Sequence, residues 1–369
     1  MRIICSKQNL LNGVQIVSKA VPGKTTMPIL ECILIDASKG VISLTANDME
    51  LGIETIVDGD IVEPGIVAID AKFLLEIVRK LPDNFVVIST DSSFKTSITC
   101  EKAKFDIAGK SGDDFSMLPV ISKNEFIVLR QFTLKDLVRQ TIFSIADNDN
   151  NKMMTGELFQ IEGSRLKVVS LDGHRISIRK VDLREEYTNR KVVVPGKTLN
   201  EVSKILNGDA ESEVMIYFTD KHIVFEFGTT TVVSRLIEGE YFRIDQMLNG
   251  DYETKVHINK KELLSCIDRA TLLIKEGDKK PIIMNISDEY MELTINSVVG
   301  SMNEEIDIAK SGKDLMIGFN PKFLIDALRV VDLEEIDMYM LNPKSPCIIK
   351  DEEDTFTYLI LPVNFTTVR

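Results

Sequence analysis

The sequence has no tryptophan, only three histidines and few cysteines. The cysteines are odd in number and lie far apart, at Cys5, Cys32, Cys100, Cys266 and Cys347. No two of them form a Cys-x-x-Cys pair, which argues against a disulfide framework or a structural zinc site and favours a reducing cytoplasm. No run approaches the ~18 apolar residues of a membrane span. The N-terminus turns polar at Ser6 and Lys7, too early for a signal peptide. We therefore expect a cytoplasmic protein.

Basic residues are also in the minority. The 369 residues include 44 Lys and Arg against 57 Asp and Glu, which gives a net charge of −13. Apolar residues make up 44% and charged residues 27%, as in ordinary globular proteins. This composition excludes a disordered chain, a collagen-like fibre and a nucleic-acid binder that is basic throughout. The length suggests two to four domains, at roughly 100–200 residues each.

An internal repeat organises the chain. Lys72, Lys197 and Lys322 each begin a similar segment, and they are spaced 125 residues apart. The runs 41–45, 166–170 and 291–295 recur at the same period. We therefore predict three tandem domains, at residues 1–122, 126–248 and 250–369.

Each repeat contains two similar halves, and each half begins with a short strand followed by an amphipathic helix. Apolar residues recur at i, i+1, i+4 and i+7 in the segments 10–17, 74–81 and 324–331. Asp70 and Asn320 stand two residues before their lysines, where they can cap the helix start. Short β-rich runs such as 29–35 and 41–46 follow. The pattern predicts an α+β fold of six β-α-β-β-β modules, two per domain.

Motif searches find little chemistry. Asp172-Gly173-His174-Arg175 could hold a general base, or it could be a tight turn after a strand with Gly173 at positive φ. Gly196-Lys197-Thr198 lacks the first glycine of a phosphate loop. The acidic run 351–354 is typical of a charged hairpin turn. We expect no metal site and no cofactor.

Positive charge gathers on the predicted helices. Their cations are Lys72, Arg79, Lys80, Lys135, Arg139, Lys197, Lys204, Lys260, Lys261, Arg269, Lys322 and Arg329. Any one of these helix faces could simply be solvated. The recurrence of one lysine in all three repeats favours a shared role in sequence-independent phosphate contact.

The chain resembles the bacterial DNA sliding clamp, the beta subunit of DNA polymerase III, over essentially its whole length. The resemblance rests on five ordered segments: 24–30 (KTTMPIL), 114–119 (DFSMLP), 171–176 (LDGHRI), 318–320 (GFN) and 358–363 (YLILPV). It implies three clamp domains per chain and two chains joined head to tail, in a ring with helices inside and sheets outside. Such a ring encircles duplex DNA, slides and tethers the polymerase, and it is not itself a catalyst.

The resemblance also implies binding partners, a cellular location and the residues that contact DNA and form the ring joint. The expected partners are double-stranded DNA, a second copy of the chain, the polymerase III catalytic subunit, the clamp loader and repair proteins. The protein would be cytoplasmic and nucleoid-associated during replication. The positions that match DNA contacts are Lys24, Lys72, Asn148, Lys152 and Lys197. Those that match the ring joint are Phe105 and Ile107 on the first-domain edge and Leu272 and Leu273 on the third-domain helix, although all four could instead be domain core.

The family has an apolar, peptide-binding cleft between its second and third domains. The matching walls are Met154, Leu171, Gly173, His174, Arg175, Ile176, Phe242, Met247, Leu359, Leu361, Pro362 and Val363, with Asn320 and Phe323 at the rim. This chain departs from the family at Leu171, where threonine is common, at 242–244 (FRI) and at Asn364. We expect a cleft that is more apolar and less basic than is typical.

Two alternatives remain open on the sequence. One is a repeat-built enzyme with Asp172 and His174 in its site. The other is an adaptor that binds peptides but never closes a ring.

Overall fold

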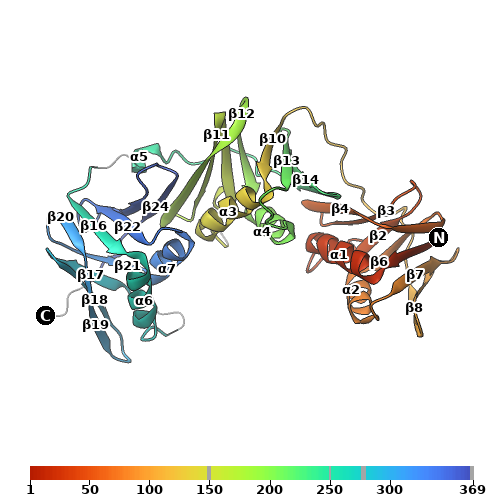
Figure 1. Ribbon diagram of the computed structural model, residues 1–369, viewed down its shortest axis with the longest axis horizontal. Helices are drawn as coiled ribbons and strands as arrows, with labels where there is room; N and C mark the ends of the chain where they lie inside the picture. Colours follow the sequence, from red (N-terminus) through yellow and green to blue (C-terminus); the bar gives the residue numbers. More distant parts are fainter. Residues whose placement is uncertain (148–150, 249–250, 276–279, 366–369) are drawn as a thin grey trace. The chain divides into compact units, whose positions relative to one another are not determined.

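The computed structural model describes residues 1–147, 151–248, 251–275 and 280–365. The chain divides into two compact units, Met1–Leu134 with Lys197–Leu236, and Lys135–Gly196 with Ile237–Arg369 (Figure 1). The chain passes from one unit to the other within the helices α3 (Gln131–Thr141) and α4 (Gly196–Ile205) and again between Leu236 and Ile237. Within the described ranges, no helix is long and apolar enough to span a membrane.

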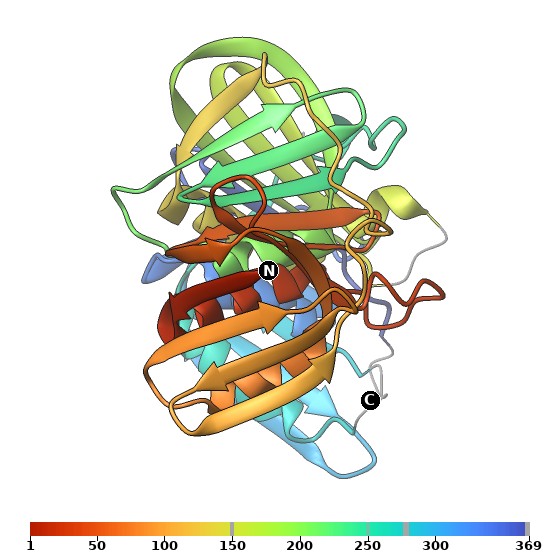
Figure 2. The same ribbon diagram turned by 90° about the vertical axis from the view of Figure 1, so that its right-hand side faces the viewer.

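The first unit has two antiparallel sheets and two complete helices, α1 (Lys7–Val17) and α2 (Ala71–Lys80). The five-stranded sheet has the order β5 (Gly59–Glu63), β1 (Arg2–Ser6), β7 (Phe85–Thr90), β8 (Lys95–Cys100), β9 (Ala103–Ala108). The eight-stranded sheet has the order β10 (Phe126–Arg130), β13 (Glu213–Phe218), β14 (His222–Phe227), β15 (Thr230–Arg235), β4 (Leu51–Val57), β3 (Ile42–Asn47), β2 (Cys32–Asp36), β6 (Ile66–Asp70). In Figure 2, which views this unit from its strand side, the two helices lie behind the strands.

The second unit repeats this plan with α6 (Lys260–Thr271), α7 (Pro321–Val330) and the short α5 (Asp245–Leu248). Its seven-stranded sheet has the order β11 (Gly156–Leu171), β12 (Arg175–Pro195), β24 (Phe356–Ile360), β23 (Cys347–Lys350), β22 (Glu335–Met340), β16 (Thr254–Asn259), β20 (Ala309–Gly312). Its four-stranded sheet has the order β19 (Ser301–Asp307), β18 (Tyr290–Asn296), β17 (Ile282–Ile286), β21 (Leu315–Phe319).

The predicted helices form for the predicted reasons. The Asp70 carboxylate accepts a hydrogen bond from the Phe73 N–H at 3.0 Å, and the Asn320 side chain accepts one from the Lys322 N–H at 3.1 Å. Pro321 occupies the first turn of α7, where a missing N–H costs nothing. The apolar stripe of α7 is buried in the main core of the second unit. The α+β prediction and both helix caps are confirmed.

Each large sheet crosses a predicted repeat boundary, and this explains why the compact units do not follow the repeats. β4 of the first repeat pairs with β15 of the second, and the Thr55 and Thr230 hydroxyls meet at 2.8 Å in the buried ladder. β12 of the second repeat pairs with β24 of the third. Because continuous ladders join neighbouring repeats, the compact units do not test where one repeat ends and the next begins. The boundaries at 122–126 and 248–250 stay a prediction.

Two local expectations need correction. The predicted strand at 29–35 begins only at Cys32, because the N–H groups of Leu30 and Cys32 donate to the carbonyls of Met27 and Ile29 and close a turn. The module pattern also changes in the second repeat. There β12 runs unbroken for 21 residues, so it both ends one module and begins the next.

One carboxyl lies wholly inside the second unit. Glu157 on β11 has no solvent exposure, and neither of its oxygens has a hydrogen-bond partner. The neighbouring Thr141 hydroxyl donates instead to the Leu137 carbonyl at 2.7 Å. Burial raises the pKa of the Glu157 carboxyl to about 8, because an apolar interior disfavours the charged form.

Glu157 should therefore make stability depend on pH. Its folded-state pKa lies above its ordinary value of 4.5, because the buried carboxyl is tolerated only in its neutral form. The contribution of Glu157 to stability is therefore fully present below about pH 4.5, and it is lost as pH rises towards about 8. We expect Glu157→Gln to unfold at a higher temperature than the wild type near pH 8 and to flatten this dependence. Thermal unfolding between about pH 5 and pH 9 measures it, with the exposed Glu162→Gln on the same strand as control. Parallel pH profiles for wild type and Glu157→Gln would contradict the assignment.

Candidate functional site

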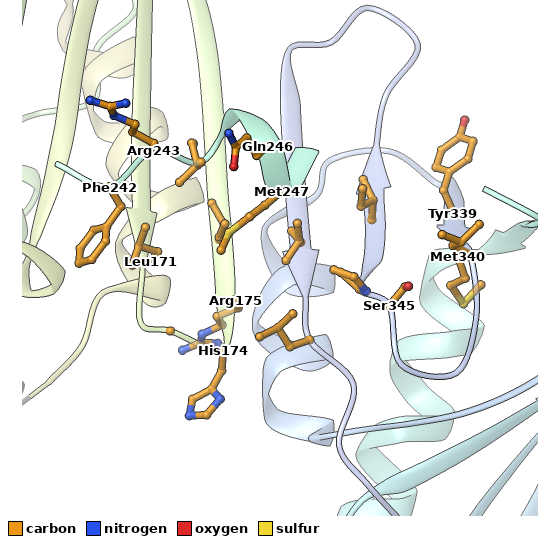
Figure 3. A pocket seen from close by; sticks show the side chains of 18 of the residues that line it. Leu171, His174, Arg175, Phe242, Arg243, Gln246, Met247, Tyr339, Met340 and Ser345 are labelled. Carbon is orange, nitrogen blue, oxygen red and sulfur yellow. The ribbon is translucent and has the colours of Figure 1, made fainter. Parts of the chain in front are cut away.

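A cavity of about 530 Å³ opens in the second unit, and apolar side chains form most of its wall (Figure 3). One part of the wall is Leu171 at the end of β11, Ile176 on β12 and Leu359 on β24. Phe242 and Met247 come from the segment around α5, and the β22–β23 hairpin closes the other side. Met247 is 60% exposed, so a large apolar side chain stands open to a ligand. Such a wall, with a few polar groups, suits an apolar peptide.

The turn between β11 and β12 places polar groups at the cavity edge. The Asp172 carboxylate accepts hydrogen bonds from the N–H groups of His174 at 2.9 Å and Arg175 at 3.1 Å. Gly173 has φ +84°, a left-handed conformation that other residues rarely adopt. The tight-turn interpretation of this tetrapeptide is confirmed.

Arg175 is buried, and each of its three side-chain nitrogens donates a hydrogen bond. Its Nε donates to Asp172 at 2.9 Å, one terminal nitrogen donates to Asp326 on α7 at 2.7 Å, and the other donates to the Phe143 carbonyl. The guanidinium also lies 4.5 Å from the ring centroid of Phe323. The side chain is 7% exposed, so it braces the turn against α7 instead of offering a free charge to a ligand.

His174 stacks on Phe323, with ring centroids 6.0 Å apart and an interplanar angle of 21°. The Asp172 carboxylate is engaged by two backbone N–H groups and by Arg175. Because these contacts make the aspartate a turn cap, the geometry gives no support to an Asp172–His174 acid–base pair. Among the residues that the structure describes, no group of three or more His, Cys, Asp or Glu could hold a metal ion.

The structure brings most of the expected cleft residues to this one cavity. Those that line it are Met154, Leu171, Gly173, His174, Arg175, Ile176, Phe242, Met247, Leu359 and Leu361. The remaining four are not among the residues that line it. Asn320 caps α7, Phe323 supports Arg175 and His174, Pro362 follows Leu361, and the Val363 N–H donates to the Gly318 carbonyl at 2.8 Å.

Sequence reasoning missed the far side of the cavity. The additional lining residues are Arg243, Ile244, Gln246, Asp251, Tyr252, Tyr339, Met340, Leu341, Ser345, Pro346 and Ile348. Ile348 on β23 pairs directly with Leu359 on β24, so both side chains face the same side of the sheet. The sequence signal that could have found this side is the strand-like run before Leu359. Paired residues on the two strands of a hairpin face the same side of the sheet.

The expected DNA-contacting residues differ in their surroundings. Lys24, Lys72 and Lys152 are exposed, and no ion pair in the described part of the chain involves them. Lys197 forms an ion pair with Asp48. Asn148 lies outside the described residues.

The expected joint residues lie at two sheet edges or next to them. Phe105, 40% exposed, and the half-buried Ile107 are on β9, the edge strand of the five-stranded sheet. Leu272 and Leu273 follow α6 instead of lying within it, because the helix ends at Thr271. Leu272 is 81% exposed, whereas Leu273 packs partly against the core. β19, beside α6, is the edge strand of the four-stranded sheet.

Three family models match consecutive stretches of the chain. The N-terminal domain of the DNA polymerase III beta subunit matches residues 1–119, the central domain matches 128–242 and the C-terminal domain matches 245–364.

Individual proteins are similar over the full length. The beta sliding clamp of Staphylococcus epidermidis is 33% identical over 98% of this chain and 99% of its own length, and that of Staphylococcus aureus is 35% identical over 94% of each. Two crystal structures cover 99% of this chain and 100% of their own. They are a putative DNA polymerase III beta subunit from Eubacterium rectale, with 72% identity and a TM-score of 0.97, and a DNA polymerase sliding clamp from Bacillus subtilis, with 34% identity and a TM-score of 0.96.

Proposed function

This chain belongs to the DNA polymerase III beta subunit family, the bacterial sliding clamps, and on that premise we propose that it is a replication processivity factor. Two copies join head to tail into a ring that encircles duplex DNA without sequence preference and slides along it. The ring tethers the replicative polymerase. The observation that carries the proposal is the run of three consecutive family matches across one chain.

The charge pattern supports this function. A closed ring is retained by topology, so it needs only weak contacts with phosphates, and exposed lysines such as Lys24, Lys72 and Lys152 can supply them. A net charge of −13 disfavours nonspecific adhesion of the remaining surface to DNA. The work takes place in the cytoplasm, at the nucleoid during replication.

The cavity supports the tethering role. We assign it to short peptide segments of the polymerase catalytic subunit, the clamp loader and repair proteins. Apolar walls give such peptides affinity, and flexible methionines such as Met154 and Met247 adapt to different sequences. The chain itself needs no catalytic group for this role, which agrees with the engagement of Asp172 by Arg175.

Ring closure should depend on the exposed Leu272. We expect Leu272→Glu to give a monomer of 41.5 kDa where the wild type gives a dimer of twice that mass, because a charge would replace an apolar contact in the proposed joint. Sedimentation equilibrium measures it. Val120→Glu, at a fully exposed position in the segment between β9 and β10, should remain dimeric. A dimeric Leu272→Glu would rule out this joint.

Processive synthesis tests the function as a whole. The cognate polymerase and clamp loader, given ATP and a primed single-stranded circle, should make long products with the wild-type chain and short ones with Leu272→Glu. The adaptor alternative predicts equally long products from both proteins. An absence of any stimulation by the wild type would contradict the proposal.

A further inference from the structure

The three lysines spaced 125 residues apart occupy one position in the fold. Lys72, Lys197 and Lys322 are each the second residue of their helix, α2, α4 and α7. The family resemblance assigns DNA contact to the first two and leaves Lys322 out. Equivalent positions on equivalent helices give no reason for that division, so the surroundings of each ammonium group have to decide it.

Lys197 is held by an acidic group of its own unit. Its ammonium pairs with Oδ2 of Asp48, whose side chain is only 7% exposed. The other oxygen of Asp48 accepts hydrogen bonds from the N–H groups of Glu50 at 3.0 Å and Leu51 at 2.7 Å. A carboxylate so poorly solvated needs a cation, and a phosphate that took Lys197 would leave this charge uncompensated.

Lys72 and Lys322 have no such partner. Both are exposed, and no carboxylate lies within ion-pair distance of either in the part of the chain that the structure describes. The nearest acids on their own helices are engaged elsewhere. Glu76 pairs with Arg79 at 2.5 Å, and Asp326 pairs with Arg175 at 2.7 Å.

We propose that Lys322, together with Lys72, contacts the phosphates of the encircled duplex, and that Asp48 withholds Lys197 from the same role. The proposal rests on the ring function described above and names which cations carry it. It adds Lys322 to the expected DNA-binding residues, and it predicts that a change at Asp48 would release Lys197 to bind phosphate.

Salt dependence distinguishes the three lysines. Each lysine–phosphate contact contributes about 0.9 to the slope of the logarithm of affinity against the logarithm of salt concentration. The experiment titrates a fluorescently labelled, sequence-neutral duplex with the full-length protein at several KCl concentrations. We expect Lys322→Ala and Lys72→Ala each to make the slope shallower by about 0.9, and Lys197→Ala to change it much less.

Asp48→Asn is the decisive variant. The amide keeps an oxygen for the N–H groups of Glu50 and Leu51 but removes the charge that holds Lys197. We expect it to steepen the slope by about 0.9, because Lys197 becomes available to a phosphate, and we expect Lys197→Ala in the same chain to reverse this change. Equally shallow slopes for Lys197→Ala and Lys322→Ala, or no effect of Asp48→Asn in a protein with unchanged thermal stability, would overturn the proposal.

Failure of this proposal can be told from failure of the ring function. A wild-type protein that supports processive synthesis, with an unchanged slope for Lys322→Ala, refutes only the assignment of the lysines. A wild-type protein that gives no stimulation refutes the function on which the assignment rests.

Discussion

Replacing Arg175 with alanine is expected to lower the free energy of unfolding of the second unit by about 3 kcal/mol. The change leaves Asp172 and Asp326, whose side chains are 13% and 22% exposed, without the cation that both contact. Breaking a buried pair in this way costs about 3–5 kcal/mol, and the partial exposure of both acids favours the lower end. The corresponding fall in the unfolding temperature is roughly 6–12 °C, which differential scanning calorimetry can measure.

Arg243 provides the matched control. It lines the same cavity, but its side chain is 87% exposed and its ion pair with Glu240 spans 3.6 Å between two solvated groups. Exposed pairs of this kind contribute about 0–1 kcal/mol, so Arg243→Ala should hardly change the unfolding temperature. Similar decreases for Arg175→Ala and Arg243→Ala would mean that Arg175 does not brace the turn.

The second large effect is expected for peptide docking. Leu361 lines the cavity, is 38% exposed and donates its backbone N–H to the His174 carbonyl at 2.9 Å. Leu361→Asp keeps that backbone contact and places a carboxylate where an apolar peptide would exclude water. A loss of about 3 kcal/mol, or roughly a hundredfold in Kd, follows from burying an unpartnered polar group. Fluorescence anisotropy with the clamp-binding peptide of the cognate polymerase catalytic subunit measures it.

Leu333→Asp is the control, because it places the same carboxylate at an exposed leucine outside the cavity. Leu333 lies in the same unit, is 44% exposed and does not line the cavity, so this variant should bind the peptide as the wild type does. Both variants should keep the wild-type unfolding temperature within a few degrees. Undiminished binding by Leu361→Asp would place the docking site elsewhere.

The sequence was sufficient for the features that depend on near neighbours. The helix stripes, the Asp70 and Asn320 caps and the turn at Gly173 each follow from residues a few positions apart, and the structure has all of them. The short strands with one helix per half-repeat gave the α+β fold, and the family resemblance gave ten of the residues that line the cavity but not the other eleven.

Contacts between distant residues could not be predicted in the same way. Asp326 reaches Arg175 across 151 residues of chain, and Asp48 reaches Lys197 across 149. Nothing local marks either acid as a partner, because each pairing exists only after the sheets have formed. The β22–β23 side of the cavity is a different case, because β23 and β24 are consecutive strands and their pairing could have been predicted from the sequence.

Encirclement links the ring to DNA by topology, and retention on circular DNA tests this link most directly. The wild-type protein is loaded onto nicked circles by the cognate loader and ATP, washed at high salt, and divided into two samples, one of which is cut once by a restriction enzyme. A ring should stay on the intact circles and leave the linear molecules, since salt screens phosphate contacts equally on both. Equal retention on circular and linear DNA would contradict encirclement, and so would no retention on either with an active loader.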